Sequence, residues 1–193
     1  EAIRKEKRAE LGLRNEFVVG HVGRFMQQKN HIFLIEIFKE IHSRRPDSLL
    51  LLVSDGRLMN DIKAKVHALG LDDAVRFLGK RRDVNELYQA MDVFLFPSLW
   101  EGLPLTGIEA QTAGLPVVMS DVITDEVCVT PNIYKVPLKA SAEEWADKVL
   151  KVTEGFRRAS MQQRVIDAGF DIQSTADFLQ DFYLRRSRNE QER

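Results

Sequence analysis

The chain has a single cysteine, four scattered histidines and no long apolar run, and each scarcity excludes a class of protein. Cys128 has no partner, so an internal disulfide is impossible, and a reducing cytoplasm suits the chain better than export. The histidines at positions 21, 31, 42 and 67 lack the spacing of metal ligands, so we expect no structural metal. We expect His21 to be packed within a strand and His31 to be a surface or capping residue.

The sequence also lacks a membrane span, a signal peptide and an excess of charge. The apolar run 49–53 is far shorter than the roughly 20 residues that a span needs. Residues 1–10 are charged and have no apolar core. The formal net charge is −1, so we expect no nucleic-acid partner. Because the chain begins with Glu1 rather than Met, we expect it to be a piece of a longer protein.

Two common nucleotide-binding motifs are missing. Neither G-x-G-x-x-G nor G-x4-G-K-[ST] occurs, which argues against dinucleotide dehydrogenases and P-loop enzymes. The chain is otherwise ordinary for a globular protein: it has 44% hydrophobic and 30% charged residues, and 193 residues suffice for one large domain or two small ones.

Apolar runs typical of strands alternate with amphipathic stretches typical of helices. The predicted strand 49–54 is apolar without alternation through Val53, as expected when helices cover both faces of a sheet. This alternation predicts an α/β fold, a Rossmann-like, doubly wound parallel sheet of about six strands with C-terminal helices. The predicted strands span 17–22, 49–54, 75–78, 92–96, 116–120 and 133–136, and the predicted helices span 32–43, 58–69, 83–90, 104–113, 141–153, 157–169 and 174–188.

Local signals add detail at the ends of these elements. Asp83 and Ser141 are expected to be amino caps of helices. The charge-rich ends, 1–10 and 185–193, are expected to be frayed and solvated.

Two cations follow the first predicted strand, at the edge of the sheet where α/β proteins bind ligands. Gly23 and Arg24 come directly after that strand, and Lys29 follows five residues later. An arginine fork and a lysine point charge together could neutralise a diphosphate. A solvated polar turn is the alternative that spacing alone leaves open. The run 80–82, KRR, has the same two interpretations.

The segment 97–121, PSLWEGLPLTGIEAQTAGLPVVMSD, is the most informative part of the chain. It predicts a helix that starts at Pro104 and stops at Gly114, whose free amide groups face an anion. Glu101 lies in the loop before this helix, and Glu109 lies about one and a half turns into it. Two carboxylates beside a phosphate site could grip hydroxyls, as a nucleotide sugar would require. The amide groups expected to face the anion belong to Leu103, Leu105 and Thr106.

Other interpretations of this segment are weaker. A glycoside hydrolase needs two carboxyl groups facing one bond, and Glu109 on a helix packed against the sheet is a poor acid. A lone carboxylate at a helix start often only compensates the helix dipole. Trp100 could stack on a ligand, whereas Trp145 is expected to anchor the core.

Several of these stretches together resemble the carboxyl-terminal domain of retaining GT-B glycosyltransferases of the group 1 family, most closely those of capsular and exopolysaccharide synthesis. The resemblance covers roughly residues 17–150, and the E-x7-E element is its most specific part. Asn30 stands where the family usually has Gly, Ser54 stands at the first Gly of G-[DE]-G, and EGLP replaces EGFG. The stretches that carry it are VGRFMQQKN, LLLVSDGRL and VRFLGKRRDVNELYQAMDVFLFPSLWEGLPLTGIEAQTAGLPVVMSD.

The resemblance implies a role for each matching residue. Arg24 and Lys29 would hold the diphosphate of a nucleotide sugar, and Glu101 would hold the donor sugar; these three are the expected catalytic residues. Glu109 would bind the ribose hydroxyls, and no metal or other cofactor is implied. The expected donor-binding residues are Gly23, Gly79, Arg81, Gly102, Leu103, Pro104, Leu105, Thr106 and Glu109.

The resemblance also implies half of a two-domain enzyme. Residues 1–16 would be a flank, 17–170 the nucleotide-sugar-binding domain, and 171–193 a helix that crosses back to a missing amino-terminal acceptor domain. Such an enzyme would be cytoplasmic or peripheral at the inner face of the membrane, and would act on a saccharide or lipid-linked saccharide. The fragment alone would bind nucleotide without transferring sugar. The alternatives are a nucleotide-sugar 2-epimerase, whose family lacks the EGLPLTGIEAQ pattern, and a non-catalytic nucleotide-sugar-binding module.

Overall fold

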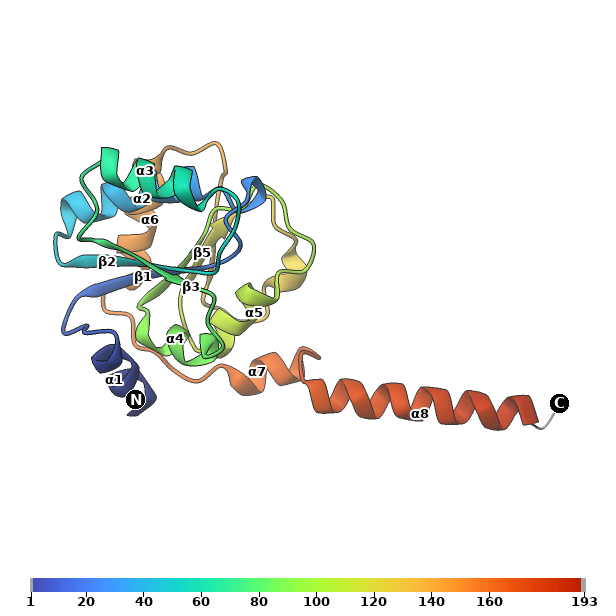
Figure 1. The fold of residues 1–193 in the computed structure, drawn as a ribbon. Coiled ribbons are helices and arrows are strands. Elements are labelled where there is room, and N and C mark those ends of the chain that lie inside the picture. The colour runs from blue at the N-terminus through green and yellow to red at the C-terminus, as the bar shows by residue number, and fades with distance from the viewer. Residues whose placement is uncertain (1, 192–193) are drawn as a thin grey trace.

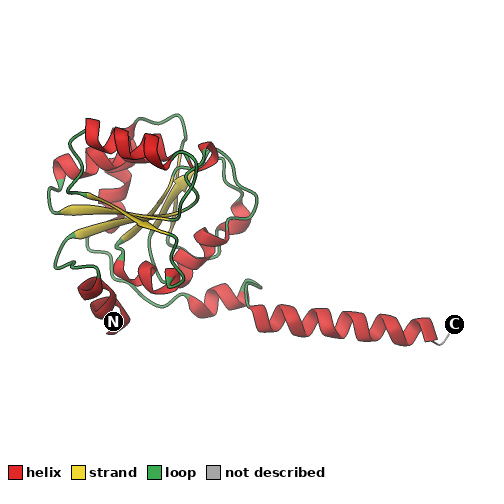
Figure 2. Cartoon of the chain, in the orientation of Figure 1, coloured by secondary structure: helices red, strands yellow, loops and turns green. Residues whose placement is uncertain are grey.

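The computed structural model describes residues 2–191, which form one parallel sheet covered by helices on both faces (Figures 1 and 2). The sheet has six strands in the order β3-β2-β1-β4-β5-β6, all paired in parallel. The prediction of a doubly wound α/β fold is therefore confirmed. The strands are β1 (Phe17–Val22), β2 (Ser48–Val53), β3 (Val75–Gly79), β4 (Val93–Phe96), β5 (Val117–Ser120) and β6 (Ile133–Val136).

Helices form a layer on each side of this sheet (Figure 1). One layer consists of α2 (His31–Arg44), α3 (Met59–Ala68) and α6 (Ala142–Thr153). The other consists of α1 (Ala2–Glu10), α4 (Val84–Ala90), α5 (Leu105–Thr112) and α7 (Gln162–Asp167). Two short 3-10 helices, η1 (Gln27–Lys29) and η2 (Asp125–Val127), lie in loops, and α8 (Ile172–Gln191) projects from the body.

The central strands are apolar because both of their faces are buried. Every residue of β1, β2, β4 and β5 is buried, which accounts for the continuous apolar runs in the sequence. Trp145 on α6 is fully buried, as expected of a core anchor. Ser141 caps α6 with a full capping box, also as expected.

The strand order reverses between β1 and β4. From β1 the chain winds outward through β2 to β3, and β4 then returns to the other side of β1. The loops that leave the carboxyl ends of β1 and β4 therefore lead to helices on opposite faces of the sheet, α2 and α5. The loops 23–30 and 97–104 flank this switch point, the place where open α/β sheets bind ligands.

The amino-terminal flank is not a frayed end, so that expectation is wrong for residues 2–10. They form α1, which packs on α4 with Lys7 and Arg8 buried. Arg4 Nη1 donates to the carbonyls of Gln89 and Met91, each at 2.8 Å, and Arg8 Nη1 donates to the carbonyl of Ala90 at 3.0 Å. Positive side chains at a helix carboxyl terminus satisfy its free carbonyls and its dipole.

Three local predictions also need correction. Asp83 occupies the amino-cap position of α4, but its carboxylate bonds to Arg81 and Lys7 rather than capping the helix. Pro104 precedes α5 as its cap residue instead of being its first helical residue. The predicted helix 157–169 is shorter, Gln162–Asp167, because the residues before it run along the surface to reach α5.

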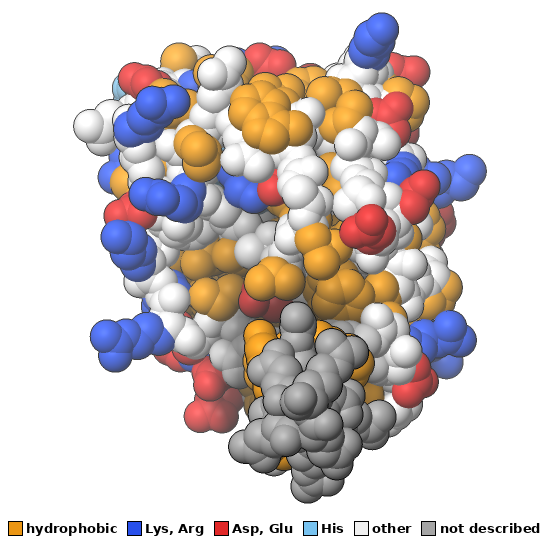
Figure 3. Space-filling model, turned by 90° about the vertical axis from the view of Figure 1, so that its right-hand side faces the viewer, with side chains coloured by type: hydrophobic (Ala, Val, Ile, Leu, Met, Phe, Trp, Pro, Cys, Tyr) orange, Lys and Arg blue, Asp and Glu red, His pale blue; other side chains and the backbone are white. Residues whose placement is uncertain are grey.

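Helix α8 leaves apolar side chains uncovered. The side chains of Phe178 and Phe182 are 68% and 47% exposed, as expected for a helix whose partner lies elsewhere. Viewed along α8, further apolar side chains gather on the body around its base (Figure 3). That the helix crosses to another domain stays a prediction.

The loop after β2 comes unusually close to the loop after β1. The Phe25 amide donates to the Asp55 carbonyl at 2.9 Å, and the Leu58 amide donates to the Phe25 carbonyl at 3.0 Å. Ser54 has φ of 126°, a conformation that favours glycine, which explains the family's glycine there. A β-carbon on Gly56 would lie 2.5 Å from the Phe25 nitrogen and oxygen.

We therefore predict that Gly56→Ala lowers the free energy of unfolding by about 3 kcal/mol, because the backbone of Phe25 cannot move aside. Gly70→Ala is the matched control: its φ is also positive, but no atom lies within 4 Å of the new β-carbon. This control should cost about 1 kcal/mol, the strain of the left-handed conformation alone. Urea unfolding of the three proteins checks the prediction, and equal losses in the two variants would contradict it.

Candidate functional site

Hydrogen bonds join the loop after β1 directly to the loop after β4. The Leu99 amide donates to the Gln28 carbonyl at 2.8 Å. Asn30 Nδ2 donates to the Pro97 carbonyl at 3.1 Å, and Gln28 Nε2 donates to the Trp100 carbonyl at 2.9 Å. Asn30 has φ of 54°, so it takes the left-handed conformation of the family's glycine while its side chain bonds to the loop after β4.

Lys29 and Glu101 meet at the centre of this junction. Lys29 Nζ lies 2.7 Å from Glu101 Oε1, and the two side chains are 14% and 6% exposed. Gln28 Nε2 donates to the other carboxylate oxygen, Glu101 Oε2, at 3.1 Å. The Lys29 ammonium also lies 5.1 Å from the centre of the Phe96 ring. A carboxylate held at both oxygens has a fixed orientation.

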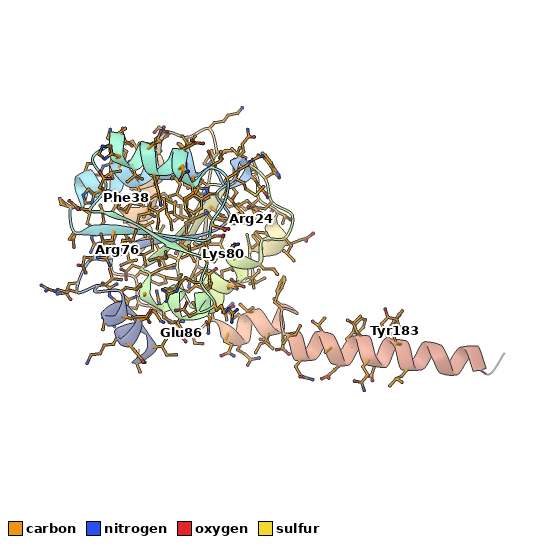
Figure 4. The ribbon with its side chains drawn as sticks, viewed as in Figure 1. Arg24, Phe38, Arg76, Lys80, Glu86 and Tyr183 are labelled. Carbon is orange, nitrogen blue, oxygen red and sulfur yellow. The ribbon has the colours of Figure 1, made fainter. Side chains whose placement is uncertain are left out.

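Arg24 stands beside this pair without a partner of its own. Its side chain is exposed, and within residues 2–191 its guanidinium makes no hydrogen bond or ion pair. Figure 4 shows Arg24 and Lys80 at the same edge of the sheet. Lys80 pairs with Asp55 at 3.0 Å, so its charge is already compensated. Since Lys29 and Glu101 also cancel, Arg24 supplies uncompensated positive charge at this edge.

At Gly23, the residue before Arg24, the backbone lies close to the side chains of His21 and Lys29. Its amide donates to the Val53 carbonyl at 3.1 Å. A β-carbon on Gly23 would lie 2.8 Å from His21 Nε2, so the position has no room for a side chain.

The amino end of α5 directly follows the loop that carries Glu101. Leu105 is the first helical residue, and Pro104 before it is in an extended conformation. Within the described residues no carbonyl accepts the amides of Leu103, Leu105 or Thr106. Gly102, Leu103 and Leu105 are exposed. Free amides at a helix start attract anions.

Glu109 lies on the exposed side of α5, where Tyr88 of α4 holds it. Tyr88 Oη donates to Glu109 Oε2 at 3.0 Å and lies 3.2 Å from the Thr106 carbonyl. Burial, with the negative charge of Glu109, raises the pKa of Tyr88 far above its usual value, so the hydroxyl stays protonated. A hollow of about 600 Å³ lies beside these residues, with Arg82 and Val84 also in its wall.

Gly79 and Arg81, in the loop after β3, were expected to bind the donor, and only Gly79 lies where that expectation requires. Gly79 ends β3 at the carboxyl edge with φ of 65°, but the Arg81 guanidinium faces α1. Arg81 Nη2 donates to Asp83 Oδ2 at 2.6 Å and to Glu10 Oε1 at 2.8 Å. Arg81 is therefore already paired, and Arg82 is the cation that borders the hollow beside Glu109.

Two histidines lie beneath the loop after β1. His21 is packed as predicted, but His31 is buried as well, so its expected surface position is wrong. Their rings are 4.8 Å apart, and Phe25 stacks on His31 at 4.3 Å. Burial and the positive charge of Lys29 lower the pKa of His31 to about 4, and burial lowers that of His21 as well. Both rings are neutral near pH 7 and belong to the floor of the site.

Two residues that contact the site, Gln28 and Tyr88, could not be recognised from the sequence. Gln28 belongs to the polar turn that was recognised, but nothing in the sequence showed that its amide reaches Glu101. Tyr88 lies on the apolar face of α4 and is indistinguishable from a core residue in the sequence. Only the packing of α4 against α5 brings its hydroxyl to Glu109.

Three further arginines lie away from this site, beside a second hollow. A hollow of about 710 Å³ lies at the opposite edge of the sheet, where Arg4, Arg8 and Arg158 bond to the carboxyl end of α4. Those guanidinium groups therefore have structural partners. Residues 2–191 contain no group of three or more His, Cys, Asp or Glu side chains arranged to hold a metal ion. In the same residues no helix has both the length and the apolar character needed to cross a membrane.

Comparison with known proteins places this site in context. Residues 16–154 match the family model described as glycosyl transferases group 1. The chain is 32% identical over 186 residues to the putative glycosyltransferase EpsF of Bacillus subtilis, covering 95% of the chain and 48% of EpsF. It is 34% identical over 185 residues to the UDP-Gal:alpha-D-GlcNAc-diphosphoundecaprenol alpha-1,3-galactosyltransferase of Escherichia coli, covering 90% and 47%.

Solved structures have the same fold. HepE of Anabaena in complex with UDP superimposes with a TM-score of 0.77 at 25% identity, over 93% of this chain and 53% of HepE. A sucrose-phosphate synthase of Thermosynechococcus elongatus superimposes with a TM-score of 0.78 at 26% identity, over 96% and 49%. The chain spans about half the length of these relatives.

We predict that the Lys29–Glu101 pair couples the two loops energetically. A double-mutant cycle with Lys29→Met and Glu101→Gln should give a coupling energy of about 1–3 kcal/mol in urea unfolding, because either single change leaves a shielded polar group without its partner. The exposed pair Lys135–Asp125 is the control, since the Asp125 side chain is 91% exposed. Its cycle should give less than about 0.5 kcal/mol. Equal coupling in both cycles would contradict the prediction.

Proposed function

The chain belongs to the group 1 glycosyl transferases, and from this premise we propose that it is the donor-binding half of an enzyme that moves a sugar from a nucleoside diphosphate to an acceptor hydroxyl. The observation that carries the proposal is the junction of Lys29 with Glu101 beside Arg24 and the free amides of α5. Such an arrangement offers positive charge to a diphosphate and a carboxylate to the sugar next to it.

Each part of the donor has a corresponding group in this site. Arg24, Lys29 and the amides of Leu103, Leu105 and Thr106 would hold the diphosphate. Glu101, with the backbone around Gly102 and Pro104, would bind hydroxyls of the sugar. Glu109 would accept hydrogen bonds from the ribose hydroxyls, with the nucleoside in the hollow of about 600 Å³ that Glu109 lines. The name of the HepE structure includes UDP, which supports a nucleoside diphosphate as the ligand class.

We propose that transfer proceeds with retention at the anomeric carbon. The bond from that carbon to the β-phosphate oxygen breaks, and a bond to the acceptor oxygen forms on the same face. The acceptor proton passes to the departing phosphate oxygen, so Glu101 need not act as a covalent nucleophile. Negative charge grows on the phosphate as the bond breaks, and Arg24 and Lys29 stabilise it without a metal.

The acceptor would be bound by a second domain that these residues do not contain. The E. coli relative's name gives a diphosphoundecaprenol-linked GlcNAc as acceptor, which supports a saccharide or lipid-linked saccharide here. A role in capsular or exopolysaccharide synthesis, with the enzyme in the cytoplasm or peripheral at the inner face of the membrane, fits such an acceptor.

Two other functions are compatible with a site of this kind. A nucleotide-sugar 2-epimerase would bind the same donor but release an epimer in the absence of any acceptor. A non-catalytic module would bind a nucleotide sugar or a protein partner without turnover. The presence of Arg24, Lys29, Glu101 and Glu109 together favours the transferase.

We predict that the chain binds at least one of UDP, GDP and ADP or their sugars in isothermal titration calorimetry. Glu109→Ala should weaken that binding about tenfold or more, because it removes a charged acceptor of ribose hydroxyl bonds. Glu154→Ala, which removes an exposed carboxylate at the end of α6, should leave the affinity unchanged. A flat response to every nucleotide would contradict the prediction and favour the non-catalytic module.

We further predict that these 193 residues alone transfer no sugar, because the acceptor domain is missing. In the whole enzyme, Arg24→Ala should lower turnover more than donor affinity, since the charge that it stabilises develops as the bond breaks. A radiolabelled-sugar transfer assay checks the first statement, and steady-state kinetics with a donor titration checks the second. Robust transfer by the fragment, or equal losses of turnover and affinity in the variant, would falsify the corresponding statement.

A further inference from the structure

Tyr88 differs from the apolar core residues around it because its hydroxyl bonds to an exposed side chain. The residue is 1% exposed, and its ring packs edge-on against Phe94 with the centroids 5.7 Å apart. Its hydroxyl reaches out of this apolar setting to the carboxylate of Glu109, which is exposed on the next helix. Phenylalanine would fill the same space, so packing alone does not explain the hydroxyl.

The hydroxyl has one proton and two acceptors within reach. Glu109 Oε2 is 3.0 Å away and the Thr106 carbonyl is 3.2 Å away. The Thr106 carbonyl lies within α5 and has a helical partner, whereas a carboxylate forms the stronger, charge-assisted bond. Tyr88 therefore donates its hydroxyl proton to the Glu109 carboxylate rather than to the Thr106 carbonyl.

The direction of the Glu109 carboxylate matters because Glu109 stands between two hollows. One, of about 280 Å³, is lined by Leu105, Ile108 and residues of α7. The other, of about 600 Å³, is lined by Tyr88, Val84 and Arg82. An exposed glutamate on a helix samples several rotamers unless something holds it. Tyr88 borders only the second of these two hollows, so its hydrogen bond draws the carboxylate to that side.

We propose that Tyr88 is a positioning residue, whose hydroxyl holds the Glu109 carboxylate toward the larger hollow so that it can accept hydrogen bonds from the two adjacent hydroxyls of a ribose. The inference rests on the proposed function, because it takes the ligand to be a nucleotide. Among the side chains that the structure describes, no other group bonds to the Glu109 side chain, so Glu109 Oε1 and the second lone pair of Oε2 are left to accept hydrogen bonds from a ligand.

The test compares a nucleoside diphosphate with its counterpart that lacks the ribose hydroxyls. The one of UDP, GDP and ADP that the unmodified chain binds most tightly is titrated beside its 2′,3′-dideoxy form. Tyr88→Phe removes one oxygen and keeps the ring. Tyr134→Phe on β6 is the matched control, because that hydroxyl makes no hydrogen bond within the described residues and its ring lies beneath Lys148. Thermal unfolding of each variant checks that the fold is intact.

We expect Tyr88→Phe to weaken binding of the ribonucleotide about fivefold and to leave binding of the dideoxy form unchanged. Tyr134→Phe should change neither. In the background of Glu109→Ala, adding Tyr88→Phe should have no further effect, because the hydroxyl acts through the carboxylate.

The outcomes separate this inference from the function on which it rests. If Glu109→Ala weakens only the ribonucleotide while Tyr88→Phe weakens neither or both forms equally, the positioning role is overturned and the donor site stands. If the unmodified chain binds none of UDP, GDP and ADP or their sugars, the proposed function fails and this inference fails with it. A fivefold loss confined to the ribonucleotide supports both.

Discussion

The loop after β1 is held on both sides, and the rest of the site depends on this constraint. On one side the backbone of Phe25 bonds to Asp55 and Leu58 so closely that only glycine fits at position 56. On the other side Lys29 meets Glu101 at 2.7 Å. Because neither side can move without breaking these contacts, Arg24 is presented from a rigid turn. Pre-organised charge is worth more to a ligand than charge that must first be ordered.

The order of the strands explains why these particular loops meet. Because the strand order reverses beside β1, the loops after β1 and β4 flank the switch point, where open α/β sheets bind ligands. The loop after β4 then leads into α5, so its free amides open beside the two cations. Two cations of the loop after β3 are already neutralised: Asp55 pairs with Lys80, and Asp83 with Glu10 pairs with Arg81. Arg24 and the start of α5 therefore supply positive charge near the Lys29–Glu101 pair, and Arg82 supplies it beside Glu109.

The strands of the sheet could be predicted from the sequence because strands that are buried on both faces are continuous apolar runs. The bounds of β1 and β6 were predicted to the residue, and β2 differed by one position at each end. The predicted loop residues Lys29 and Glu101 also lie together in the structure, and they could be singled out because strand ends and a Pro-to-Gly helix are local signals. What could not be predicted depends on distant partners. Lys7 and Arg8 look solvated in sequence, yet their partners lie on α4, in the loop before it and at its carboxyl end. The burial of His31 and the reach of Tyr88 to Glu109 likewise arise only when helices pack.

The Lys29–Glu101 pair poses a question of charge, since a lysine already paired with a carboxylate has little net field to offer a diphosphate. The answer lies in the geometry of the ammonium group. It has three donors, and Glu101 Oε1 takes one of them within the described residues. In the proposed donor complex Lys29 can therefore bond to a phosphate oxygen while it keeps Glu101 in place. Gln28 holds the other carboxylate oxygen, so Glu101 does not turn when the anion arrives. The net attraction then comes from Arg24 and α5, and the pair sets the direction from which Glu101 meets the sugar.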